Sequence, residues 1–236
     1  MTKENILQEV KKALNEAKSG ELYSNILRLT ELQKNLLEDV RHENNKNNNA
    51  GKIEKLVKDI LKAGTKNGNY KMMAYTHTTP DGLQYALDGH RLIEIYKPLD
   101  LPDWSKDGDG DLVKYYDVKK IMPAAYNSYL QIASPDPAEL RAYVKTNKKE
   151  NPICKLYTPG GSDLYINATW LSLAIDCFTD PVIEMQEGYT DYKSPVYIRG
   201  KEGRLLILPV NINTNGLQGK YKYIFDSANN SEIEAA

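Results

Sequence analysis

The chain has 236 residues, of which 41% are hydrophobic and 27% charged, enough for a large folded domain with its own core. The 31 Lys and Arg nearly balance the 32 Asp and Glu, so the net charge of −1 argues against attraction of the whole molecule to nucleic acid or membranes. No apolar run approaches the roughly 18–20 residues of a membrane span, and the first ten residues lack a signal-peptide stretch. We therefore expect a cytoplasmic protein that does not associate with membranes.

Two amphipathic helices are predicted at the start of the chain, over residues 3–18 and 22–40, because their apolar residues recur at helical spacing. Ser19 and Gly20 separate the two helices, so the segment reads as a helical hairpin. The polar tract 44–49 (NNKNNN) follows as a linker. Residues 1–49 are therefore expected to form a hairpin and an Asn-rich linker.

A third helix is predicted over residues 52–66, with charge and hydrophobicity on opposite sides. Successive residues of a helix are about 100° apart, so its lysines fall within an arc of about 120°. A lysine face of this kind can bind DNA phosphates without reading sequence, although Asp59 lies inside the arc and a solvated helix face is the alternative. The candidate DNA-binding residues are Lys52, Lys55, Lys58, Lys62 and Lys66.

From residue 70 onward the pattern changes to strands. Strands are expected at 71–79 and 83–96, joined by a turn, and then at 129–133, 153–158, 164–167, 182–187, 195–199 and 205–212. Asp136 and Pro137 are expected to begin a helix that runs to about residue 148, and a second helix is expected at 169–178. Residues 226–236 are expected to form a disordered tail. Such a pattern predicts an α+β fold of antiparallel sheets with helices on one face, over residues 50–225.

Several of these segments resemble the bacterial DNA polymerase III beta subunit, the DNA sliding clamp. The segment LQYALDGHRLIEIY (83–96) resembles the family's Asp-Gly-His-Arg-Leu strand, and LYINATWLSLAIDCF (164–178), SPVYIRG (194–200) and RLLILPVNI (204–212) resemble its closing helix and strands. Between them, YYDVKKIMP (115–123) and PAELRAYVK (137–145) resemble the opening of its final domain. Leu87 and Asn211 depart from the family's usual Thr and Arg. The chain is also short for a clamp.

The resemblance implies a non-catalytic DNA- or replication-associated accessory protein without cofactors. Its partners would be double-stranded DNA, bound non-specifically, and replication proteins that carry short linear motifs; oligomerisation is left open. In the family, two of the matched stretches line a slot for extended peptides. Carried over, that peptide pocket would be lined by Gly89, His90, Arg91, Leu92, Pro209 and Val210. A phage or mobile element is the source we expect for such a reduced replication module.

Alternative functions are weighed against this interpretation. A docking module could keep the fold and bind linear peptides without encircling DNA. The run Asp107–Asp111 resembles the start of an EF-hand, but Leu112 and Val118 stand where Gly and Glu are needed, so no metal site is predicted. Cys154 and Cys177 form no motif and are expected to be buried free thiols. Because the three histidines are scattered and no catalytic motif is present, we expect no enzyme activity.

Overall fold

A computed structural model describes residues 49–67, 71–104, 115–122, 129–186, 194–211, 223–229 and 231–234, with single helical positions at 12 and 31. The chain divides into two units, 1–51 and 52–236, and nearly all of the described residues belong to the second. The predicted helical hairpin, the Asn-rich linker up to residue 48 and the EF-hand-like run lie outside the described residues.

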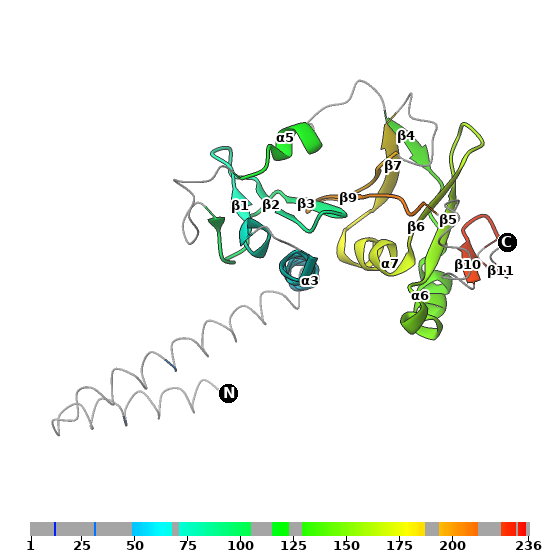
Figure 1. Cartoon of the computed structure of the whole chain (residues 1–236), viewed down its shortest axis with the longest axis horizontal. Helices are drawn as coiled ribbons and strands as arrows, with labels where there is room; N and C mark the ends of the chain where they lie inside the picture. Colours follow the sequence, from blue (N-terminus) through cyan, green and yellow to red (C-terminus); the bar gives the residue numbers. More distant parts are fainter. Residues whose placement is uncertain are drawn as a thin grey trace. The chain divides into compact units, whose positions relative to one another are not determined.

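A seven-stranded antiparallel sheet forms the centre of the second unit, with the strand order β1-β2-β3-β9-β8-β7-β4 (Figure 1). The predicted α+β class is therefore confirmed. The strands are β1 (His77–Thr78), β2 (Gln84–Leu87), β3 (Arg91–Ile95), β4 (Tyr129–Ile132), β7 (Val182–Gln186), β8 (Val196–Arg199) and β9 (Gly203–Ile207).

The sheet combines two similar halves, each a helix followed by three antiparallel strands. Helix α3 (Ala50–Asn67) precedes β1, β2 and β3, and helix α7 (Ala168–Cys177) precedes β7, β8 and β9. The halves join where β3 pairs with β9, from Arg91 opposite Ile207 to Ile95 opposite Gly203. A side chain at Gly203 would collide with the carbonyl oxygen of Glu94, so this close approach requires glycine. The predicted strand–helix–three-strand order over 164–212 is confirmed.

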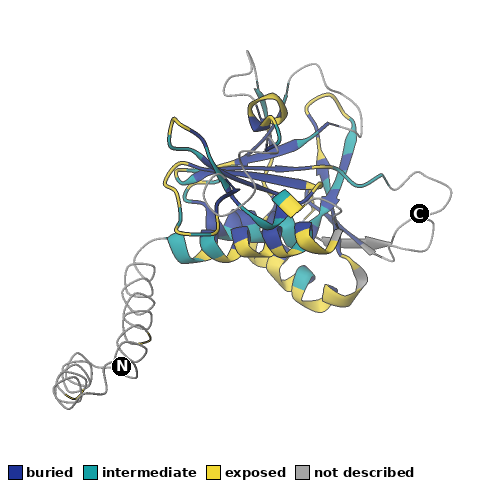
Figure 2. Cartoon of the chain, turned by 60° about the vertical axis from the view of Figure 1, so that its left-hand side comes forward, coloured by how far each residue is buried: buried dark blue, intermediate teal, exposed yellow. Residues whose placement is uncertain are grey.

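The longer helices cover one face of the sheets. Helices α3, α6 (Pro137–Thr146) and α7 turn their buried sides to the strands and their exposed sides outward (Figure 2). The main core lies between them and includes Ile60, Ile93, Leu171 and Leu205. Asp136 caps α6 as predicted, since its side chain accepts hydrogen bonds from the amides of residues 138 and 139.

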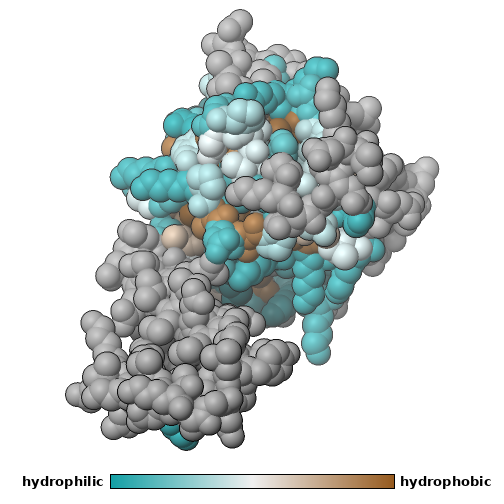
Figure 3. Space-filling model, turned by 90° about the vertical axis from the view of Figure 1, so that its left-hand side faces the viewer, coloured by the Kyte–Doolittle hydropathy of each residue, from teal (hydrophilic) through white to brown (hydrophobic). Residues whose placement is uncertain are grey.

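A second core lies on the opposite face of the seven-stranded sheet. Residues 71–74 form a short 3-10 helix (Lys71–Ala74) rather than the predicted strand, and Met73 of this helix and Val118 of α5 (Val118–Ile121) contribute to this core. Large side chains fill this core; they include Tyr85, Leu92, Trp104 and Met122. From the side that carries β1, hydrophobic residues reach the surface in a small central area among hydrophilic ones (Figure 3).

A smaller sheet has the order β11-β10-β5-β6, with strands β5 (Ile153–Tyr157), β6 (Asp163–Asn167), β10 (Tyr223–Asp226) and β11 (Ser231–Glu234). Two expectations are corrected here. The region 226–236, predicted as a disordered tail, contains β11, which pairs antiparallel with β10. The sheet is mixed rather than purely antiparallel, because β10 runs parallel to β5. Local sequence did not indicate β11, since its pairing depends on β10 being seated on β5.

No helix in the described part of the chain is long and apolar enough to cross a membrane.

Candidate functional site

The lysine face of α3, defined as Lys52, Lys55, Lys58, Lys62 and Lys66, lies on the solvent side of the helix. All five side chains are exposed, whereas the apolar side of the helix, including Leu56, Val57 and Ile60, is buried against the sheet. The period predicted from the sequence therefore places these residues correctly. Burial of the apolar side fixes the rotation of the helix, so the five ammonium groups are presented together.

Two of these lysines have partners within the protein. Lys52 Nζ donates a 3.0 Å hydrogen bond to the carbonyl oxygen of Asp176, near the C-terminus of α7, where the helix dipole favours a cation. Lys58 pairs with Glu54 one turn earlier, at 2.6 Å. Both contacts are exposed. Because surface ion pairs contribute only about 0–1 kcal/mol, an incoming phosphate could replace them.

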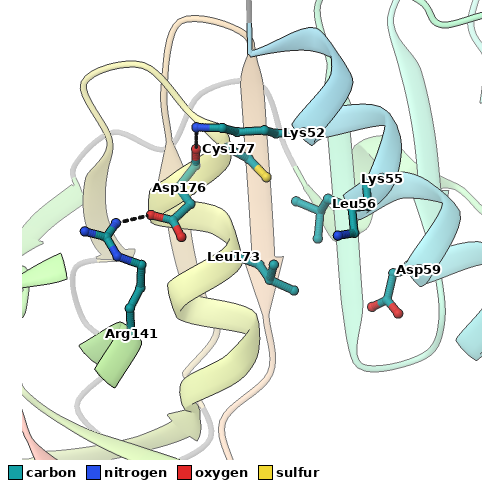
Figure 4. A pocket seen from close by; sticks show the side chains of 8 residues that line it. All are labelled: Lys52, Lys55, Leu56, Asp59, Arg141, Leu173, Asp176 and Cys177. Atoms are coloured by element: carbon teal, nitrogen blue, oxygen red, sulfur yellow. Dashed lines mark hydrogen bonds and ion pairs between the residues drawn. The ribbon is translucent and has the colours of Figure 1, made fainter. Parts of the chain in front are cut away.

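A groove of about 400 Å³ lies between α3 and α7, next to the lysine face (Figure 4). Its apolar lining comes from Leu56, Leu173 and Cys177, and Arg141 of α6 pairs with Asp176 across its edge at 2.6 Å. The remaining lining residues are Lys52, Lys55 and Asp59. Positive side chains from two helices therefore border this groove, and the sequence alone did not indicate that α6 contributes one.

The two stretches predicted to line a peptide pocket lie side by side. The turn of residues 88–90 precedes β3, and the amide of Leu208 donates a 2.9 Å hydrogen bond to the carbonyl oxygen of His90. Gly89 adopts a φ of 88°, which favours glycine and lets the chain reverse between β2 and β3. Gly89 and His90 are exposed and Pro209 and Val210 are half-buried, so this junction is accessible.

Arg91, placed in the pocket by the sequence analysis, is instead an internal link. Its side chain is 1% exposed and pairs with Asp88 at 2.8 Å and with Asp59 of α3 at 2.9 Å. Its guanidinium also lies 4.6 Å from the ring centre of Trp170. Arg91 therefore holds the turn, α3 and α7 together and presents no free guanidinium to a ligand.

The strand predicted over 83–96 is two strands, β2 and β3, joined by the turn of residues 88–90. Strand β3 begins only at Arg91, and His90 lies in the turn before it. The His90 ring stacks on Trp170, with 6.2 Å between ring centres, so both side chains approach the same indole. Side-chain alternation applies within a strand and fails at its end.

Two further predicted pocket residues, Leu92 and Val210, are held by different sheets. Leu92 is 2% exposed and belongs to the core on the α5 side of the large sheet. Strand β9 ends at Ile207, so the chain leaves the ladder before Pro209, as expected for a residue that cannot donate a backbone hydrogen bond. The amide of Val210 then donates to the carbonyl oxygen of Tyr165 in β6.

Trp170 is the residue at this junction that sequence reasoning did not assign to the site. Ala174 and Ile175 are buried, whereas Trp170 and Leu173 are half-buried at the edge of the core. A tryptophan in the first turn of an otherwise aliphatic helix is a signal for an edge position, because its indole is large and rarely fully enclosed.

Within the described ranges no group of three His, Cys, Asp or Glu could hold a metal ion. Cys154 and Cys177 are buried and free, as predicted. Burial raises the pKa of both thiols, that of Cys177 to about 12, so neither forms a thiolate readily.

No family model matches the sequence, and no curated protein sequence matches it. Several solved structures match it in part. A protein from Eubacterium rectale, assigned provisionally as a DNA polymerase III beta subunit, is 14% identical with a TM-score of 0.41, over 66% of this chain and 63% of that chain. The beta subunit of Thermotoga maritima is 14% identical with a TM-score of 0.30, over 56% of this chain and 43% of its own.

The Helicobacter pylori beta clamp, solved with a DNA ligase peptide, is 15% identical with a TM-score of 0.30, over 55% of this chain and 41% of its own. The chain thus spans less than two thirds of each of these structures. Over roughly half to two thirds of its length it is similar to DNA polymerase III beta subunits.

Proposed function

We propose that the chain is a non-catalytic accessory protein of DNA replication, related in fold to sliding clamps, which binds double-stranded DNA without sequence preference. The lysine face of α3 would make the contacts. The observation that carries this proposal is the exposure of all five lysines on one helix whose opposite side is buried.

The physical basis is neutralisation of phosphates. A rigid helix holds the lysine stems in one direction, and each flexible ammonium group can meet a phosphate as a point charge without reading base edges. Each phosphate contact changes the slope of log K against log salt concentration by about −0.9. Because only a few lysines take part, binding is weak and strongly dependent on salt.

The test compares two triple variants with the same change in net charge. Lys55, Lys58 and Lys62 are changed to Glu on the lysine face, and Lys119, Lys120 and Lys149, which are exposed and lie outside α3, are changed to Glu in the control. Fluorescence anisotropy with a duplex at several salt concentrations measures affinity. We expect the first variant to lose binding and the second to keep most of it, while circular dichroism shows both folded. Equal binding by both variants would count against the lysine face.

A second candidate function is supported by the junction of residues 88–90 with 208–210. The hydrogen bond from Leu208 to His90 holds two accessible stretches together beside the half-buried ring of Trp170. An extended peptide with Gln followed by Leu and Phe anchors would dock there through apolar side chains and backbone hydrogen bonds. Its affinity would be micromolar, about −8 kcal/mol. In this alternative the chain is a docking module that does not need to encircle DNA.

A further inference from the structure

The hairpin of β10 and β11 covers an edge of β5. Strand β5 pairs antiparallel with β6 on one side, and its other side is occupied by β10, with Ile224 opposite Ile153 and Phe225 opposite Cys154. Strand β11 pairs with β10 and lies outermost. Without the hairpin, β5 would present a row of unpaired backbone groups, which is a template for another strand.

The contacts between the hairpin and β5 are specific. Phe225 is 2% exposed and its ring lies 5.4 Å from that of Tyr143 in α6. The Tyr157 hydroxyl donates to the Asp226 carboxylate at 2.9 Å, and the amide of Ser227 donates to the carbonyl oxygen of Lys155. The edge of β5 therefore fits an incoming strand with the pattern Ile-Phe-Asp.

The hairpin of β10 and β11 is joined to the preceding strand, β9, by a long connection. Strand β10 follows β9, which belongs to the other sheet, only after residues 208–222. Val210 is held to β6 through its hydrogen bond to Tyr165. Residues 211–222 could span about 40 Å when extended, at about 3.3 Å per residue. The connection can therefore reach the β5 edge of another molecule.

We propose that the β5 edge is a strand-addition site which the chain closes with its own hairpin, and that its other occupant is the hairpin of a second copy. In the exchanged dimer each hairpin makes with the partner's β5 the same contacts that it makes with its own β5 in the monomer. The free energies of monomer and dimer therefore differ only through the conformation and entropy of the connection. Such exchange is a low-cost route to a dimer. It is favoured by high protein concentration and does not depend on DNA binding.

The experiment uses full-length protein in which Cys154 and Cys177 are changed to Ala and one new cysteine is placed at a register partner. Neighbouring strands lie about 4.8 Å apart, within the range of Cα distances that a disulfide spans. Ile153→Cys in one sample and Ile224→Cys in another are mixed, incubated at high concentration and oxidised gently. A mixture of Lys62→Cys with Asp100→Cys, two exposed positions outside the hairpin, measures collisional cross-linking. The double variant I153C/I224C reports that the two positions are in register.

We expect a disulfide-linked heterodimer from the 153 and 224 mixture, increasing with protein concentration and exceeding that of the collision control. At low concentration the double variant should run as a cross-linked monomer on a non-reducing gel. Two results would overturn the proposal. An internal disulfide in the double variant, with no heterodimer above the control, would mean that the hairpin never leaves its own β5. The absence of any disulfide in the double variant would mean that β10 is not paired with β5.

Discussion

The guanidinium of Arg91 lies 2.9 Å from the carboxylate of Asp59, and this ion pair joins the turn before β3 to helix α3. The same guanidinium pairs with Asp88 and packs on Trp170. The lysine face and the junction of residues 88–90 with 208–210 are therefore connected through one buried side chain. The relative position of the lysine face and this junction therefore depends on Arg91.

Changing Arg91 to Met should destabilise the protein by about 3–5 kcal/mol, the cost of leaving one member of a buried ion pair without its partner. Both Arg91 and Asp88 have side chains that are 1% exposed, so the Asp88 carboxylate would stay buried without its cation. Urea unfolding measures the free energy. The double variant D88N/R91M should recover part of the loss, and equal stability of R91M and wild type would show that the pair is unimportant.

Changing Asp59 to Asn should tighten DNA binding. Asp59 is 52% exposed and is an acidic group within the lysine face, so its removal lowers repulsion of a phosphate. The gain is at most about 1 kcal/mol, the energy of two unit charges about 4 Å apart in water. Asp117→Asn, an exposed ion-paired carboxylate on the opposite face, is the matched control for anisotropy at low salt. A gain of the same size in both variants would point to net charge alone.

Changing Val210 to Asp should abolish binding of a Gln-Leu-Phe type peptide while the protein stays folded. Val210 is half-buried, so a carboxylate there can reach water yet places a charge in the apolar contact region. Isothermal titration calorimetry measures peptide binding, and Tyr96→Phe, at an exposed aromatic at the other end of β3, serves as control. Unchanged affinity in V210D would remove Val210 from the peptide site.

Stability should fall as the pH is lowered through the range in which His77 titrates. Burial lowers the pKa of His77, and the nearby Asp103 carboxylate opposes this only in part. The Nδ1 atom of His77 is buried without a hydrogen-bond partner among the described residues. The unfolded chain, with a His pKa near 6.5, binds the proton more readily than the folded chain. Protonation therefore favours unfolding as the pH drops below about 6.5.

Thermal unfolding between pH 7 and pH 5.5 would measure this effect. In the variant His77→Gln, which stays neutral, the midpoint should depend less on pH over the same interval. His90→Gln, at an exposed histidine, is the matched control and should keep the wild-type dependence. An identical pH dependence in wild type and H77Q would assign the loss of stability to other groups.

The sequence by itself determined the features that depend on local periodicity and on capping. The lysine and apolar sides of α3 follow from a 3.6-residue period, and the start of α6 follows from Asp136 before Pro137, because both signals act within one or two turns. The α+β class followed from the order of segments, and the burial of both cysteines followed from their residue type.

Tertiary structure decided which of these residues meet. The role of Arg91 changed from pocket residue to internal link because Asp59, 32 positions earlier in the chain, and Trp170 on α7 close around it, and no local pattern records such distant partners. Strand β11 forms only because β10 finds a parallel place beside β5, so a segment whose own sequence indicates a tail becomes ordered by long-range pairing. Local sequence sets which side of an element is apolar, whereas the packing of distant elements sets which polar groups remain free to bind a partner.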